Sequence, residues 1–261
     1  TKKTRAIVVV HYAGVGCEMD KILEIANHHG IAVVEDNAHG LFGKYRNRWL
    51  GTFGCLATQS FHETKNITCG EGGALLINNE KFIERAEIIR EKGTDRTRFF
   101  RGQVDKYSWV DVGSSYVMSD ILAAFLYGQL ENWKKIQRKR KLIWDRYNNE
   151  LKDWAKRRDI QTPFVPKHCD QAYHMYYLIM PTVSERSKFI NKLKENNITA
   201  VFHYLSLDQS PIAKKMQMKG WKKSNCPISV NISDRIVRLP FFTGLSVKDQ
   251  SRIIDFIKIE L

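Results

Sequence analysis

The sequence predicts an α/β protein with a mostly parallel sheet, helices on both faces of that sheet, and a smaller C-terminal α+β domain. Residues 6–11 and 31–36 are short runs rich in β-branched side chains, as is typical of buried strands. Between them, residues 18–29 carry apolar side chains at helical spacing, and Gly30 follows as a helix-ending glycine. A strand, a helix and a strand of this length form a βαβ unit, which implies parallel strands.

The rest of the chain continues this alternation and then changes character. We expect strands at 57–61 and 74–77, a helix at 80–92, an irregular arginine-rich stretch at 93–109, and a helix capped by Ser119. The smaller domain is expected to contain strands at 173–180 and 198–204 and helices at 185–196 and 247–261. The predicted domains are the C-terminal portion of a larger domain at 1–130, a connecting helix at 131–160 and the small domain at 161–261.

Composition narrows the class of protein. The chain has 261 residues, 43% of them hydrophobic, which is ordinary for a globular protein. No apolar run approaches the roughly 20 residues that cross a bilayer, so we expect neither membrane insertion nor a signal peptide. The chain has five widely spaced cysteines, and no two of them form a Cys-x-x-Cys pair. This pattern predicts no zinc site and favours the reduced thiols of a cytoplasmic protein.

The net charge of +14 raises the possibility of a nucleic-acid binder. Much of the excess falls in residues 133–154, where the large apolar side chains recur at steps of three, four and seven. That spacing predicts a long amphipathic helix whose basic residues, including Lys135, Arg138, Lys139 and Lys141, face solvent. The pattern therefore favours a solvated helix surface over a nucleic-acid patch, although excess positive charge also suits a diphosphate-bearing substrate.

Single residues give weak signals on their own. Asp36 ends a predicted parallel strand, at the edge where α/β sheets bind ligands, and it could equally cap the following turn. Lys65 and Ser60 follow the next strand and could open on the same edge. A hydrolase triad of Ser60, His62 and Asp36 lacks the Gly-x-Ser-x-Gly turn. The histidines show no metal-ligand spacing, so no metal site is predicted.

Four segments taken together are more specific than any residue alone. They are residues 34–40 (Val-Glu-Asp-Asn-Ala-His-Gly), 51–54 (Gly-Thr-Phe-Gly), 60–66 (Ser-Phe-His-Glu-Thr-Lys-Asn) and 70–73 (Gly-Glu-Gly-Gly). In order and spacing these segments resemble the DegT/DnrJ sugar aminotransferases. The resemblance implies fold type I of the pyridoxal 5′-phosphate (PLP) transferases, a homodimer and transfer of an amino group from L-glutamate.

The resemblance also assigns roles to residues. Lys65 is expected to bind the cofactor covalently, and Asp36 to pair with the nitrogen of its ring. His39 falls where the family places a residue near the ring hydroxyl, and Ser60 is expected to bind the phosphate. Ser115 stands where many members have an asparagine that reaches the cofactor phosphate of the other subunit, so this shorter side chain departs from the pattern.

Residues 85–94, 99–107 and 113–120 resemble one branch of the family. That branch aminates C4 of a TDP-4-keto-6-deoxyhexose, giving TDP-4-amino-4,6-dideoxy-D-galactose for enterobacterial common antigen. Amination of another nucleotide sugar or another carbon stays open, as does a catalytically inactive or regulatory member. A dehydratase relative has histidine in place of the lysine, so Lys65 argues against it.

The chain starts without Met, directly at a predicted core strand. The resemblance implies that the family's N-terminal segment, which contributes to phosphate binding and ring stacking, is missing. If the 261 residues were the whole polypeptide, we would expect weak cofactor binding and little activity.

Overall fold

The computed structural model describes residues 1–222 and 224–260 and divides them into two compact units. The first unit contains residues 1–136 together with 165–174, and the second contains the remaining described residues. The sequence predicted three consecutive ranges, whereas these two units are each made of separated segments. The predicted domain ranges therefore stay predictions. Each unit is described by itself below.

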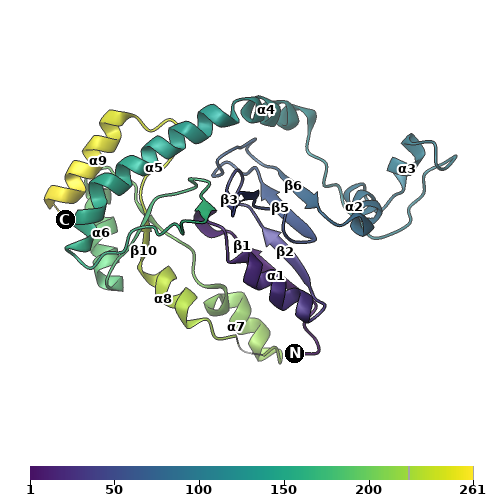
Figure 1. Cartoon of the computed structure of the whole chain (residues 1–261), viewed down its shortest axis with the longest axis horizontal. Helices are drawn as coiled ribbons and strands as arrows, with labels where there is room; N and C mark the ends of the chain where they lie inside the picture. Colours follow the sequence, from purple (N-terminus) through teal and green to yellow (C-terminus); the bar gives the residue numbers. More distant parts are fainter. Residues whose placement is uncertain (223, 261) are drawn as a thin grey trace. The chain divides into compact units, whose positions relative to one another are not determined.

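The first unit is built on a four-stranded sheet. Its strands are β1 (Ala6–Val10), β2 (Ala32–Asp36), β5 (Leu56–Ser60) and β6 (Gly73–Ile77), in the order β1-β2-β5-β6. β1, β2 and β5 run parallel, and β6 pairs antiparallel with β5. Figure 1 shows these strands side by side, with α1 (Met19–His28) lying along β1 and β2. The predicted α/β class and the βαβ unit are therefore confirmed.

One face of the sheet packs against α1. Met19 and Ala26 of the helix are buried together with Val9 of β1 and Val33 of β2. Each fully buried aliphatic side chain of this kind contributes roughly 1.5–3 kcal/mol relative to an exposed one. The alternation of side chains along the strands places Val9 and Val33 on the helix side, which explains why the predicted helix and strands meet there.

The remaining elements of the first unit are shorter. They are the 3₁₀ turns Tyr12–Gly14 and Glu80–Phe82, the strands β3 (Lys44–Tyr45), β4 (Arg48–Trp49) and β7 (Cys169–Asp170), and the helices α2 (Ile83–Arg90), α3 (Arg96–Phe100) and α4 (Asp120–Glu131). Ser119 caps α4 as predicted, since its hydroxyl accepts a hydrogen bond from the Leu122 amide at 3.4 Å. The stretch 93–109 was expected to be irregular, but it contains the short helix α3.

The second unit has the predicted α+β character. It contains β8 (Tyr177–Ile179), β9 (Val201–Phe202) and β10 (Ile236–Arg238), with the antiparallel order β8-β10-β9. Its helices are α5 (Trp133–Lys156), whose first turn belongs to the first unit, α6 (Val183–Glu195), α7 (Pro211–Met218), α8 (Pro227–Arg235) and α9 (Val247–Glu260), with a 3₁₀ turn at Leu207–Gln209. Leu261, the end of the predicted terminal helix, lies outside the described residues.

The long basic helix is confirmed as α5. The predicted apolar stripe is buried at Ile143, Trp144, Tyr147, Leu151 and Trp154, and the four basic residues named above are exposed. Arg140 is buried, with its guanidinium over the Phe241 ring at 4.8 Å, and the spacing of apolar residues did not indicate this. Burial lowers the pKa of Arg140 to about 10. Within residues 1–222 and 224–260, no helix has both the length and the apolarity to cross a bilayer.

The strand predicted at 173–180 is wrong in its first half. β8 begins only at Tyr177, because Tyr173 has a left-handed backbone (φ 52°) that an extended strand does not accommodate. The amide of the preceding Ala172 donates to the carbonyl of Gly14 at 2.8 Å in the first unit. The chain therefore turns at this point before it enters the small sheet.

A buried carboxylate fixes the end of β2. Glu35 is fully buried and accepts hydrogen bonds from His11 Nε2 at 2.8 Å and from the amides of Gly51, Phe53 and Gly54 at 2.6–2.7 Å. Burial raises the pKa of Glu35, but the bonds from His11 and the three amides outweigh it, so the pKa lies below its ordinary value. The carboxylate therefore ties the glycine-rich connection before β5 to β1 and β2.

We predict that Glu35→Gln lowers the free energy of unfolding by about 3 kcal/mol at neutral pH, because donors are left facing an amide NH₂. The lowered pKa makes this stabilisation present above the unfolded-state pKa of about 4.3 and lost as the pH falls through the folded-state value. Urea unfolding across pH measures both effects. The exposed Glu24→Gln on α1 is the control, and equal losses in both variants would contradict the assignment.

Candidate active site at the carboxyl edge of the sheet

Two residues predicted from the sequence share one edge and one face of the sheet. Asp36 ends β2 and lies beside Thr58 of the parallel strand β5, and Ser60 ends β5 two residues later. Paired residues on neighbouring strands point to the same face of a sheet, and so do residues two apart on one strand. The side chains of Asp36 and Ser60 therefore project from the same face. This face is opposite to the one that carries Glu35 and packs against α1.

Asp36 is held by the turn that follows it. Its Oδ1 accepts a hydrogen bond from the Ala38 amide at 3.1 Å, so the turn-capping role considered from the sequence is present. Asn37 is fully buried and donates from Nδ2 to the Leu50 carbonyl at 3.0 Å. One carboxylate oxygen is thus used to set the orientation of Asp36, which is compatible with a ligand role for the other.

The face that carries Asp36 is open in this chain. Val8 and Val10 of β1 and Leu75 of β6 share it, and they are 65%, 48% and 49% exposed. Such apolar side chains on a largely parallel sheet are ordinarily covered. Asp36 and Ser60 are therefore accessible from that side.

Lys65 lies in a loop that is anchored at both ends. Its amide donates to the His62 carbonyl at 2.9 Å, which closes a turn directly after β5. On the far side of Lys65, Ile67 and Cys69 are buried in a cluster with Phe61 and with Leu126 of α4. Gly70 then takes a left-handed backbone (φ 85°), which glycine adopts readily in a tight turn. The loop thus presents a half-buried Lys65 beside the end of β5.

A histidine pair connects this loop to the turn after β2. The buried Asn66 donates from Nδ2 to the Ala172 carbonyl at 2.5 Å, so its Oδ1 accepts from His174 Nδ1 at 3.0 Å. The ring of His174 stacks on His39 with centroids 4.0 Å apart and 16° between the planes. Asn66, the neighbour of Lys65, therefore contacts His39 through the buried imidazole of His174.

His39 itself has a defined tautomer. The Ala13 amide donates to its Nδ1 at 3.3 Å, so in the neutral ring the proton is on Nε2. An Nε2–H group is a hydrogen-bond donor and suits an oxygen that carries negative charge. The position of His39 near the ring hydroxyl of the cofactor stays a prediction.

The sequence did not indicate His174, Asn66 or the segment around them. Val165–His174 joins the first unit through β7, which pairs with β3, and through the bond from Ala172 to Gly14. A Cβ on Gly14 would lie 2.8 Å from the Ala172 Cβ and 2.9 Å from the His39 carbonyl oxygen. Only glycine fits this contact, and Gly14 (φ 85°) was the one available signal for it.

Ser115 is the predicted residue that the structure does not place with the others. Its backbone pairs with Glu91 just after α2, and the neighbouring Lys92 amide donates to the Ser114 carbonyl at 3.0 Å. Asp36 and Ser60 are instead at the carboxyl ends of β2 and β5. A role for Ser115 at a cofactor therefore stays a prediction that concerns a second copy of the chain.

The residues present fit pyridoxal phosphate. A pyridinium nitrogen needs a carboxylate, an aldehyde needs a lysine amine, and a phosphate needs hydroxyl and amide donors. Asp36, Lys65 and Ser60 supply these groups around one edge of the sheet, and His39 supplies an N–H donor. Among residues 1–222 and 224–260, no group of three or more His, Cys, Asp or Glu side chains could hold a metal ion.

Comparison with known proteins decides the family. The sequence pattern of the DegT/DnrJ/EryC1/StrS aminotransferase family matches residues 1–258. The chain belongs to this family. The resemblance noted from the four motifs is therefore confirmed, whereas the particular branch is not.

Relatives agree with this assignment. The chain is 34% identical over 264 residues to protein MJ1066 of Methanocaldococcus jannaschii and 30% identical over 265 residues to the spore coat polysaccharide biosynthesis protein SpsC of Bacillus subtilis. Each alignment covers 99% of this chain and 67% of the relative. The chain thus spans about two thirds of the length of these relatives.

A solved structure of a putative sugar aminotransferase has the same fold. Spr1654 of Streptococcus pneumoniae, in its PLP-form, superposes with a TM-score of 0.87 at 24% identity, covering 99% of this chain and 68% of that protein. This likeness confirms fold type I as the fold class.

We predict that Asn66→Ala lowers the free energy of unfolding by about 1–3 kcal/mol, because His174 and the Ala172 carbonyl both lose a buried partner. Amide hydrogen exchange of the loop around Lys65 is expected to quicken. Mass-spectrometric exchange measures this, with the exposed Asn27→Ala of α1 as the control. Unchanged protection of the loop in Asn66→Ala would show that the bridge does not hold it.

Proposed function

We propose that the protein is a PLP-dependent sugar aminotransferase that transfers an amino group from L-glutamate to C4 of a TDP-4-keto-6-deoxyhexose. The product is TDP-4-amino-4,6-dideoxy-D-galactose, for a cell-surface polysaccharide of the enterobacterial common antigen type. The observation that carries the proposal is that Asp36, Ser60 and Lys65 gather at one edge of the sheet. Asp36 and Ser60 share one face there, and Lys65 follows β5. Asn66 and His174 connect the loop of Lys65 to His39.

The proposed roles follow from these positions. When bound, pyridoxal phosphate supplies an electron sink that stabilises negative charge on the carbon next to nitrogen. The Asp36 carboxylate keeps the ring nitrogen protonated, and the His39 Nε2–H donates to the ring oxygen. The Ser60 hydroxyl binds the phosphate. Lys65 Nζ would hold the cofactor and, as a free amine, would take the proton from the α-carbon of glutamate and supply one at the sugar C4.

The sugar and the carbon position rest on residues 85–94, 99–107 and 113–120, which resemble the C4-aminating branch. Amination of a different nucleotide sugar or a different carbon is the second candidate. Similarity to SpsC, a spore coat polysaccharide biosynthesis protein, favours a surface polysaccharide in either case. All five cysteines are free thiols, which supports the proposed cytoplasmic location.

We predict that Lys65→Ala abolishes the visible absorbance of lysine-bound pyridoxal phosphate and lowers the transamination rate by roughly 10²–10⁴-fold or more. The reason is that both attachment and proton transfer depend on Nζ. Absorbance titration with the cofactor and a glutamate-dependent assay measure the two effects. Lys81→Ala, at an exposed lysine beside α2, is expected to retain both, and retention in Lys65→Ala would refute the role.

The reaction itself is tested by supplying pyridoxal phosphate, L-glutamate and TDP-4-keto-6-deoxyglucose and identifying the product by NMR. The proposal predicts a 4-amino-4,6-dideoxy sugar with the axial C4 amine of the galacto configuration. An equatorial C4 amine would select the second candidate, and so would amination only of a 3-keto-6-deoxy nucleotide sugar supplied in place of the 4-keto one. Absence of any amino sugar from the 4-keto substrate, with cofactor bound, would contradict amination at C4.

We also propose that the protein acts as a homodimer. Trp109, Val112, Tyr116 and Ile121, on either side of Ser115, are 79%, 79%, 68% and 82% exposed. Large apolar side chains gathered along one stretch of chain commonly mark a protein interface. A second copy that covers them would also bring Ser115 to a cofactor.

We predict that Ile121→Glu, at the start of α4, shifts the protein from dimer to monomer because a charge is placed in the apolar contact. Light scattering coupled to size-exclusion chromatography measures the mass. Leu142→Glu, at an exposed apolar residue of α5, is the matched control and is expected to leave the dimer intact. A wild-type monomer, or a dimer in Ile121→Glu, would contradict the interface.

A further inference from the structure

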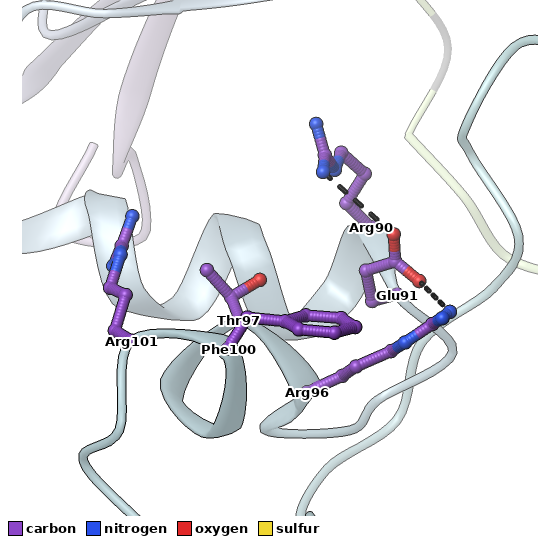
Figure 2. A pocket seen from close by; sticks show the side chains of 6 residues that line it. All are labelled: Arg90, Glu91, Arg96, Thr97, Phe100 and Arg101. Carbon is purple, nitrogen blue, oxygen red and sulfur yellow. Dashed lines mark ion pairs between the residues drawn. The ribbon is translucent and has the colours of Figure 1, made fainter. Parts of the chain in front are cut away.

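A basic pocket lies between the end of α2 and α3, away from the edge that carries Asp36 and Ser60. It has a volume of about 410 Å³ and is lined by Arg90, Glu91, Arg96, Thr97, Phe100 and Arg101. Figure 2 shows Arg90 and Arg96 reaching the Glu91 carboxylate from two sides, with the Phe100 ring next to Arg96. None of these residues has a role in the site described above.

The lining residues have an excess of positive charge. The lining includes three guanidinium groups but only one carboxylate, that of Glu91, whose contacts with Arg90 and Arg96 are both 3.8 Å long. Ion pairs of this length at the surface hold their partners weakly. Each guanidinium has five N–H donors, so Arg90 and Arg96 can bind a second anion without giving up Glu91. A phosphate or diphosphate is the anion that suits paired planar donors.

Arg101 differs from the other two arginines. It makes a two-pronged contact with Glu87, at 2.6 and 3.0 Å, and Glu87 does not line the pocket. Its charge is therefore largely compensated. Arg90 and Arg96 are the groups available to an anionic ligand.

The pocket also offers a flat apolar surface. Phe100 is 70% exposed, and the Arg96 guanidinium lies 5.2 Å from its ring centroid. A large exposed aromatic ring is a platform on which a nucleobase can stack, and an adjacent guanidinium adds to such stacking. A nucleoside diphosphate has a base that can stack on the aromatic ring and a diphosphate that can bind the neighbouring guanidinium groups.

The backbone connects this pocket to Ser115. Glu91 and Ser115 form a β-bridge, and the Tyr116 amide donates to the Arg90 carbonyl at 3.1 Å. Arg90, the last residue of α2, and Glu91 therefore lie beside the segment that carries Ser115.

We propose that this pocket binds the nucleoside diphosphate part of the sugar substrate, with Arg90 and Arg96 on the diphosphate and Phe100 stacked on the base. The inference rests on the proposed function, because that function makes a nucleotide sugar the substrate. It adds the residues that recognise the nucleotide, which the four sequence motifs do not include.

The test is isothermal titration of the cofactor-loaded protein with thymidine diphosphate and with inorganic pyrophosphate. Arg96→Gln and Arg90→Gln are each expected to weaken binding of both probes roughly tenfold, because a charge-assisted contact is lost. Phe100→Ala is expected to weaken thymidine diphosphate roughly tenfold while leaving pyrophosphate within about twofold, because only the base stacks. Binding of both probes should also weaken with added salt.

Arg98→Gln is the matched control. Arg98 is on the same helix, pairs with Glu84 at 3.3 Å and does not line the pocket, so its variant is expected to stay within about twofold of wild type. Unfolding by urea confirms that each variant is folded. Affinities unchanged in Arg90→Gln and Arg96→Gln, or reduced equally in Arg98→Gln, would overturn the proposal.

The two proposals fail separately. Cofactor attached to Lys65 together with nucleotide binding that ignores the pocket variants would overturn the pocket and leave the aminotransferase. Nucleotide binding that follows the pocket variants, without cofactor attachment to Lys65, would support the pocket and overturn the proposed reaction.

Discussion

The buried carboxylate of Glu35 is the interaction on which the first unit depends. It accepts hydrogen bonds from His11, which follows β1, and from three amides of the connection that leads to β5. These bonds fix the ends of three neighbouring strands relative to one another. Because adjacent residues of a strand point to opposite faces, fixing Glu35 on the helix side fixes Asp36 on the open side. The structural carboxylate and the proposed catalytic one are consecutive residues with opposite surroundings.

A second set of contacts brings the lysine loop to this frame. The loop after β5 is anchored by Ile67 in an apolar cluster and by Asn66 in a polar one. Through His174, the polar anchor reaches His39 in the turn after β2. The half-buried Lys65 is thus followed directly by two anchored residues, Asn66 and Ile67, whose side chains are buried.

The sequence predicted what periodicity and local chemistry control. The runs at 6–11 and 31–36, the helix between them and the basic helix α5 follow from the spacing of apolar residues. Motif order was sufficient to recognise the family. It could not reveal the bond between Asn66 and His174, because these residues are 108 positions apart and an asparagine carries no pattern. The burial of Arg140 and the helix α3 were also not predicted, because both depend on tertiary contacts that override local composition.

We propose that Lys65, and no other lysine, binds the cofactor. Borohydride reduction of the protein after incubation with pyridoxal phosphate makes the attachment permanent, and peptide mapping by mass spectrometry then locates it. We expect a phosphopyridoxyl group on the peptide that contains Lys65, at one group per chain. Labelling spread over exposed lysines such as Lys81, or no labelling of Lys65, would contradict it.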